Sequence, residues 1–237
     1  RMRNALKEGE TLGVGTAPPG TISIEQVIET AAQKAGWQKT GHGWERTKVS
    51  DQSSGIQSVL QGCGFAAGFK NIGFSFGYQE NCWARVEIYG TAEVERVVAY
   101  HAGAEVGQGT HTVMTQMVAE AVGVPLEKVA LFASDTATMG NSGSVSASRM
   151  TFMAGNAIRG AAKAALEKWL IEERPAIGEF KYLAPQTTPF TEETGQSMPN
   201  FAYAYAAHAV EVEVDTDTGF VRLLHVISAD DVVQAIN

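Results

Sequence analysis

The stretch TFMAGNAIRGAAKAALEKWL, residues 151–170, carries the strongest structural signal in the chain. Its apolar residues return every three or four positions over about five turns, which predicts an amphipathic helix with one buried face. That predicted face comprises Phe152, Met153, Ala157, Ile158, Ala161, Ala162, Ala165, Leu166, Trp169 and Leu170.

Two further segments have helical spacing. Thr110–Val122 repeats its apolar residues along one face, which predicts a second amphipathic helix. Residues 24–35 predict a shorter helix, and the spacing of Ser23 and Gln26 predicts a capping box at its start.

Extended segments fill much of the remaining chain. Trp83–Tyr89 and Glu93–His101 predict one hairpin, Ala207–Val214 and Val221–Ile227 a second, and Val129–Ala133 a short strand. A further strand is expected within residues 62–77, where glycines interrupt a Phe-rich run. Because the hairpins and helices do not alternate regularly, the predicted fold class is α+β, with mixed or antiparallel sheets and two long amphipathic helices.

Residues 172–200 hold four of the seven prolines and show little periodicity. They predict an irregular surface excursion that separates residues 1–171 from the hairpin of residues 201–237. Arg1 at the start and an apolar run at the end suggest an internal fragment of a longer protein.

Composition argues against several classes of partner. The net charge is −8 with no basic cluster, which disfavours nucleic acid and anionic membranes. We find no apolar run of the roughly 18 residues that a membrane span needs and no signal peptide, so a cytoplasmic protein is expected. Cys63 and Cys82 form no CxxC pair, so a zinc or iron–sulfur site built from this chain alone is not expected, and both cysteines are predicted to be buried thiols.

Two loops rich in small residues, Gly107–Thr110 and Gly143–Ser148, each lead into a predicted helix. The first turn of a helix presents free N–H groups that attract anions, and Arg149 adds a positive charge. One interpretation is a phosphate-bearing cofactor held between both loops; the other is that Gly and Ser only cap two helices. A helix start contributes about 0.3–2 kcal/mol and nanomolar binding needs about 12 kcal/mol, so two loops alone do not suffice.

Other motifs are weaker. Neither loop fits a Walker A pattern, and we expect no parallel strand–helix unit around residues 103–109. His111 is predicted to be a neutral, hydrogen-bonded imidazole and Asp135 a turn former. Phe74, Phe76 and Tyr78 alternate, and core packing is favoured over contact with a planar substrate.

Several motifs, in this order and spacing, resemble the large subunit of the molybdenum hydroxylases, the xanthine dehydrogenase and aldehyde oxidase family. The resemblance spans nearly the whole chain and is densest over residues 101–171. It is carried by Arg3-Asn4, Lys7–Gly9, Gly68–Gly77, Glu105–Thr112, Leu126–Val129, Ser134–Thr136, Ser144–Arg149, Gly155–Ala157, Asp231-Val232 and Ala235–Asn237.

This resemblance implies a molybdenum–molybdopterin cofactor whose dithiolene, and no protein side chain, holds the metal. Residues 1–171 would be the cofactor-loop part. The residues implied to contact the cofactor are Gly107, Gln108, Gly109, Ser146, Ala147, Ser148 and Arg149, and the aromatic implied to pack on a flat substrate is Phe76.

The resemblance also implies hydroxylation of an N-heterocycle or an aldehyde with water as oxygen donor. Electrons would leave through 2Fe-2S clusters and FAD on other segments or subunits. The catalytic base is a glutamate expected downstream of Asn237, so the fragment is expected to be inactive by itself. Alternatives are a relative of carbon monoxide dehydrogenase or hydroxybenzoyl-CoA reductase, and a scaffold or assembly module without a cofactor.

Overall fold

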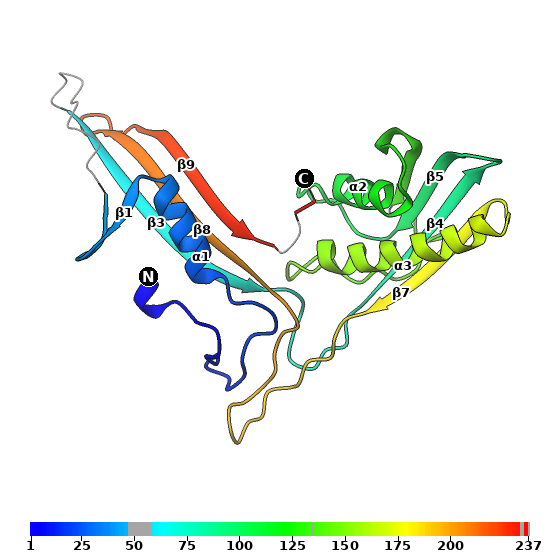
Figure 1. The fold of residues 1–237 in the computed structure, drawn as a ribbon, viewed down its shortest axis with the longest axis horizontal. Coiled ribbons are helices and arrows are strands. Elements are labelled where there is room, and N and C mark those ends of the chain that lie inside the picture. Colours follow the sequence, from blue (N-terminus) through cyan, green and yellow to red (C-terminus); the bar gives the residue numbers. More distant parts are fainter. Residues whose placement is uncertain (47–57, 134, 233–234, 237) are drawn as a thin grey trace. The chain divides into compact units, whose positions relative to one another are not determined.

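The computed structural model describes residues 1–46, 58–133, 135–232 and 235–236. The chain divides into two units, each with its own hydrophobic core (Figure 1). The first unit comprises Arg1–Gly13, Ala17–Lys70 and Tyr203–Val233, and the second Val14–Thr16, Asn71–Ala202 and Gln234–Asn237.

The first unit is a three-stranded sheet with a helix on one face. Helix α1 (Ile24–Lys34) lies along the sheet β3–β8–β9, whose strands are β3 (Val59–Asn71), β8 (Tyr203–Asp215) and β9 (Val221–Asp231) (Figure 1). The core between them comprises Ile24, Val27, Ile28, Ala31, Tyr205 and Ala207. The predicted helix and the β8–β9 hairpin are confirmed.

The predicted capping box is wrong. Ser23 is the N-cap residue of α1, but its side chain makes no capping hydrogen bond, and its hydroxyl is buried without a partner among the described residues. The first unit also contains a small hairpin of β1 (Trp37–Thr40) and β2 (Gly43–Arg46) and a short 3-10 helix, η1 (Met2–Asn4).

The second unit is built on a four-stranded sheet in the order β6–β5–β4–β7. Its strands are β4 (Asn81–Gly90), β5 (Val94–His101), β6 (Val129–Ala133) and β7 (Ala176–Leu183). The β4–β5 hairpin is confirmed and β7 is antiparallel to β4, whereas β5 and β6 are parallel.

Helices α2 (Thr110–Val122) and α3 (Met150–Leu170) cover one face of this sheet (Figure 1). Alternate residues of β4 pack against them, and the predicted apolar face of α3 is buried around Met153, Ala157 and Ile158. Phe152, Leu166 and Trp169 are partly buried. Leu170 is 79% exposed, so its predicted burial is wrong: it is the last helical residue, past the end of the covering surface.

Two expectations about strands are overturned. The irregular excursion over residues 172–200 contains β7, an edge strand that places the small residues Ala176 and Gly178 against α3. Strand β5, α2 and β6 form a parallel strand–helix–strand unit, joined in part through the 3-10 helix η2 (Leu126–Lys128). Residues 103–109 therefore lie inside the kind of unit that we expected to be absent there, because periodicity identifies strands without identifying their partners.

The described residues contain no helix long and apolar enough to cross a membrane. Cys82 is buried, as predicted, but Cys63 is exposed on β3.

Candidate cofactor-binding site

The two loops predicted to bind a cofactor begin at the same edge of the second unit's sheet. Residues His101 of β5 and Ala133 of β6 are paired at the carboxyl ends of these parallel neighbours. The chain leaving β5 leads into α2, and the chain leaving β6 leads into α3. Open α/β sheets bind ligands at this edge, because the loops and helix starts that follow adjacent strands converge there.

The segments that flank the two loops contact each other. The Ala102 amide donates a hydrogen bond to Ser142 Oγ (3.1 Å), and that hydroxyl donates to the carbonyl of Trp83 (2.9 Å). The first turns of both helices, at Thr110 of α2 and Met150 of α3, line one narrow crevice. Loops separated by more than thirty residues in the sequence are thus held on one part of the second unit.

A third loop, which follows β3 and carries Phe76, joins them. The Gly73 amide donates to the carbonyl of Ala147 (2.9 Å), and the Phe76 amide donates to the carbonyl of Pro199 (3.0 Å). Phe76 is 51% exposed and its ring meets Phe190 edge-on. The structure therefore places the predicted substrate-contacting aromatic on a loop that is tied to the Ser146–Ser148 loop.

The preference for core packing of Phe74, Phe76 and Tyr78 is wrong. All three are exposed, and they follow β3, which ends at Asn71, so they do not share one face of a strand.

Backbone strain gathers in two of these loops. Among the described residues, five non-glycine residues have positive φ, and four of them are the pairs Ser75-Phe76 and Ala147-Ser148. Such conformations cost about 1–3 kcal/mol each and concentrate where a loop is shaped for a ligand. This observation was not accessible to sequence patterns.

The Gly107–Gly109 loop is organised around the carboxylate of Glu105. Its Oε1 accepts the amide hydrogens of Gly107 (2.8 Å) and Gly109 (3.0 Å), and its Oε2 accepts that of His111 (3.0 Å). These bonds, led by the one from His111, hold the pKa of Glu105 below its ordinary value. The expectation of free N–H groups at the start of α2 therefore holds only in part. The protein supplies its own anion to the His111 amide, whereas no hydrogen bond among the described residues uses the amides of Thr110 and Thr112.

The Gln108 side chain also forms hydrogen bonds within its own loop. Its Oε1 accepts from the Val106 amide (2.7 Å), and its Nε2 donates to the Ala104 carbonyl (3.0 Å) and to Thr110 Oγ1 (2.7 Å). The side chain is exposed, so a ligand reaches it at the surface of an already ordered loop.

Two histidines hold Gly103, at the start of the same loop. The Gly103 amide donates to Nδ1 of buried His101 (2.9 Å), and Nε2 of His111 donates to the Gly103 carbonyl (2.9 Å). The predicted hydrogen-bonded state of His111 is confirmed. Because Nδ1 of His101 accepts, its Nε2 carries the hydrogen and faces the Sγ of Cys82 at 3.2 Å.

Burial keeps this His–Cys pair neutral at pH 7. It lowers the pKa of His101 to about 4, helped by the charge of Arg149, and it raises the pKa of the Cys82 thiol to about 11. A thiol with so high a pKa is a poor nucleophile, so the pair is structural.

Arg149 was predicted to contact the cofactor, but the structure buries its side chain inside the protein. Its side chain is 1% exposed, and its Nε forms an ion pair with equally buried Glu80. The guanidinium also donates to the carbonyls of Ser142 (3.2 Å), Ser144 (2.8 Å) and Asn81 (2.7 Å). Four of its five N–H groups are thus used inside the protein, because a buried charge needs a counter-ion and hydrogen-bond partners. It shapes the loop and does not offer its charge to a ligand.

The Ser146–Ser148 segment offers donors that fit an anionic cofactor. Ser146 and Ser148 are exposed, and among the hydrogen bonds found for the described residues none uses the amide N–H of Ala147 or Ser148. Main-chain donors next to small side chains, just before the start of α3, suit the phosphate and pterin groups of such a cofactor.

The family model of the molybdopterin cofactor-binding domain matches residues 30–177 and 168–237. The chain belongs to this family. The predicted cofactor, molybdenum carried by molybdopterin, and the resemblance to the molybdenum hydroxylases are therefore confirmed.

Proteins of similar sequence support the assignment to this family. The xanthine dehydrogenase molybdenum-binding subunit of Escherichia coli O157:H7 is 30% identical over 174 residues, covering 71% of this chain and 21% of that subunit. An aldehyde oxidoreductase of Megalodesulfovibrio gigas is 28% identical over 185 residues, covering 77% of this chain and 18% of that protein. The chain spans about a fifth of the length of these relatives.

The aldehyde oxidoreductase of Desulfovibrio desulfuricans has the same fold. The two structures superpose with a TM-score of 0.70 at 22% identity, over 96% of this chain and 25% of that one. The predicted α+β class with mixed sheets is confirmed.

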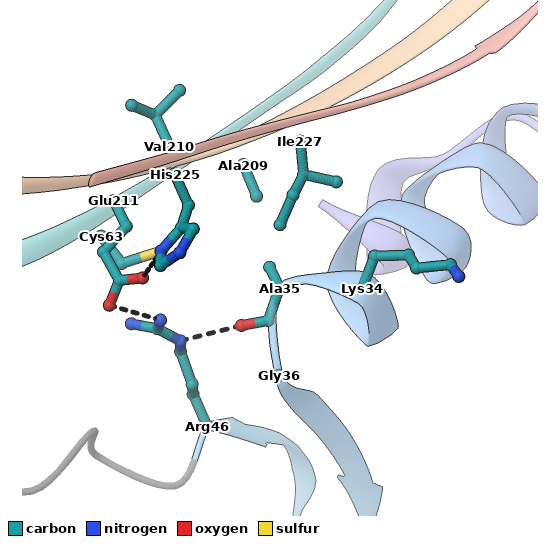
Figure 2. A pocket seen from close by; sticks show the side chains of 10 residues that line it. All are labelled: Lys34, Ala35, Gly36, Arg46, Cys63, Ala209, Val210, Glu211, His225 and Ile227. Atoms are coloured by element: carbon teal, nitrogen blue, oxygen red, sulfur yellow. Dashed lines mark hydrogen bonds and ion pairs between the residues drawn. The ribbon is translucent and has the colours of Figure 1, made fainter. Parts of the chain in front are cut away.

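A separate hollow lies in the first unit of this molybdopterin-binding chain. Figure 2 shows Arg46 reaching from β2 to Glu211 on β8 (2.7 Å) and to the carbonyl of Ala35 (2.9 Å), while His225 contacts the other oxygen of Glu211 (2.9 Å). The hydrogen bonds from Arg46 and His225 lower the pKa of Glu211. The predicted cofactor residues all belong to the second unit, so we interpret this ionic cluster as a structural tie between β2 and the sheet.

Sequence reasoning missed three residues of the site: Glu80, His101 and Glu105. Glu105 begins the Glu105–Thr112 motif, and an acidic residue shortly before the start of a helix was a signal that could have identified it. Glu80 and His101 had no comparable signal, because their partners are distant in the sequence.

Proposed function

We propose that this chain forms the cofactor-binding part of a molybdenum enzyme of the xanthine dehydrogenase or aldehyde oxidoreductase type. One observation carries the proposal. In a chain of the molybdopterin-binding family, the segments that carry the Gly107–Gly109 and Ser146–Ser148 loops leave the carboxyl ends of adjacent parallel strands and are joined by the Ala102–Ser142 hydrogen bond. The names of the relatives, a xanthine dehydrogenase subunit and an aldehyde oxidoreductase, support this class of enzyme.

In this proposal each loop has its own role. The amides of Ala147 and Ser148 donate to the anionic groups of the cofactor, and the Gly107–Gly109 loop presents Gln108 to the pterin. Phe76 packs on the ring of a planar substrate. Arg149 and Glu80 hold the second loop in shape from inside the protein.

When bound, the cofactor supplies hydroxylation of an aldehyde or an N-heterocycle with water as oxygen donor. The residues of this chain bind and orient, and we assign no catalytic residue among them. We place the catalytic glutamate, the 2Fe-2S clusters and the FAD on other segments or subunits of a cytoplasmic enzyme.

Metal analysis tests the proposal. The protein is produced from its complete gene in a host that makes the cofactor, and we expect about one molybdenum per chain together with a pterin released on denaturation. If the protein from that host contains no molybdenum, the proposed enzymatic function is refuted and a scaffold of the same fold is favoured.

The variant Gln108→Ala tests the first loop. We expect lower molybdenum content in the purified protein, whereas Gln33→Ala, an exposed change on α1 in the first unit, keeps the wild-type content. Unchanged molybdenum in Gln108→Ala removes this residue from the site.

A further inference from the structure

The start of α2 is already occupied by a negative charge that belongs to the chain. Both oxygens of the Glu105 carboxylate are used, Oε1 by two amides and Oε2 by one, at 2.8–3.0 Å. Hydrogen bonds to an ionised acceptor are stronger than neutral ones. A cofactor phosphate at the same amides would have to displace this carboxylate.

Packing does not explain the shape of the Gly107–Gly109 loop. Both glycines have positive φ, +103° and +79°, and a Cβ built on either would meet no atom within 4 Å. The residues from Glu105 to Gln108 are exposed. The loop therefore keeps its conformation through hydrogen bonds, chiefly those to the carboxylate of Glu105 and to the amide group of Gln108.

We propose that Glu105 is a positioning residue, which fills the start of α2 in place of an external anion and holds the Gly107–Gly109 loop in the shape that receives the cofactor. This inference rests on the proposed function. It gives the two loops different roles. The amides of Ala147 and Ser148, which have no hydrogen-bond partner among the described residues, bind the anionic groups of the cofactor. The Gly107–Gly109 loop contributes the Gln108 side chain and its own surface.

The first test is amide hydrogen exchange in cofactor-free protein made from the complete gene. In Glu105→Ala we expect the amides of Gly107, Gly109 and His111 all to exchange about five- to tenfold faster, the scale of a lost helix cap. Glu105→Gln keeps a single acceptor oxygen, so part of this protection survives. The control is Glu120→Gln, which removes the same charge from an exposed position on α2. Unchanged exchange at the three amides in Glu105→Ala overturns the proposal.

The second test measures molybdenum in the same proteins after expression with the cofactor, at a temperature where circular dichroism shows all of them folded. We expect severalfold less molybdenum in Glu105→Ala and wild-type content in Glu120→Gln. Faster amide exchange with undiminished molybdenum overturns the positioning role. A wild-type protein whose three amides are protected but which holds no molybdenum refutes the proposed function and leaves the assignment of the cap intact.

Discussion

Arg149 shows how a residue of a loop proposed to bind a ligand supports that loop from inside the protein. Its charge is balanced by Glu80, and its remaining donors hold the carbonyls of Ser142 and Ser144, so the turn of the loop is built around the guanidinium. Gly143 is needed beside it, because a Cβ there would lie 2.7 Å from Nη1. Glu80 extends the same support to the neighbouring loop by accepting the Phe74 amide.

Removing one partner of this buried pair is expected to be costly. Glu80→Gln leaves the guanidinium of Arg149 buried without a counter-ion, so we expect the free energy of unfolding to fall by about 3–5 kcal/mol in denaturant titrations. Glu167→Gln is the control, because Glu167 pairs with Lys163 on the exposed side of α3. This variant should lower the free energy of unfolding by about 0.5 kcal/mol or less. Similar losses in the two variants contradict the structural role of the pair.

The second residue-scale prediction concerns pH. The folded pKa of His101 is about 4 and its ordinary value is 6.5, so between these values the unfolded chain binds more protons. The contribution of neutral His101 to stability is complete above about pH 6.5 and declines as the pH falls toward 4, by on the order of 3 kcal/mol.

Denaturant titrations at neutral pH and at about pH 4.5 measure this change, and His101→Gln should flatten it. Around His101 lie Cys82 on β4, Ser142, Arg149 and His111, of which Arg149 and, to a smaller extent, His111 add to the lowering of the pKa by burial. An equally steep loss of stability in His101→Gln assigns the pH dependence to other groups.

At the scale of elements, α3 and β7 approach so closely that a side chain cannot stand between them. A Cβ on Gly178 would lie 2.1 Å from the carbonyl oxygen of Ala161 and 2.4 Å from the amide nitrogen of Ala165. These are backbone atoms of a buried helix, so the helix itself would have to move away from the strand.

Gly178→Ala is therefore expected to lower the free energy of unfolding by at least about 1–3 kcal/mol, the usual range for overpacking. Gly160→Ala is the matched comparison, because the nearest atoms to its Cβ would belong to the side chain of Phe180, which is 42% exposed and can shift without moving the backbone of α3. The gain of about 1 kcal/mol in helix propensity offsets that contact. If thermal or denaturant unfolding shows equal losses of stability in Gly178→Ala and Gly160→Ala, this distinction is contradicted.

At the scale of the whole molecule, all the cofactor contacts proposed here come from the second unit and from loops at one edge of its sheet. A helix start contributes about 0.3–2 kcal/mol to an anion, and nanomolar affinity requires about 12 kcal/mol. Because Glu105 already occupies the start of α2, this chain supplies fewer free donors than two open helix starts would.

The 237-residue chain, purified alone and incubated with the cofactor, should consequently retain little molybdenum after gel filtration and show no turnover. The protein from the complete gene, loaded in the same way, serves as the positive control. Stoichiometric molybdenum on the isolated chain shows that its own loops suffice.

The elements of this protein follow from local sequence because their signals are local. Thr110–Val122 and Val129–Ala133 have the bounds expected for them, and α3 begins one residue before the quoted stretch, since helical and strand periodicity depend on neighbouring residues. The site loops were also recognisable, because Gly, Gln and Ser in a fixed order mark a family whose model matches the chain.

Tertiary structure decided what occupies those loops. Three features depend on how backbone and side chains meet in space. They are the parallel pairing of β5 with β6, the hydrogen bond from the His111 amide of α2 to the Glu105 carboxylate, and the ion pair of Arg149 with Glu80. A sequence shows that a helix start attracts an anion, but whether that anion is a cofactor or the protein's own glutamate depends on loop geometry. Burial in turn decides whether an arginine offers its charge outward or must be neutralised within.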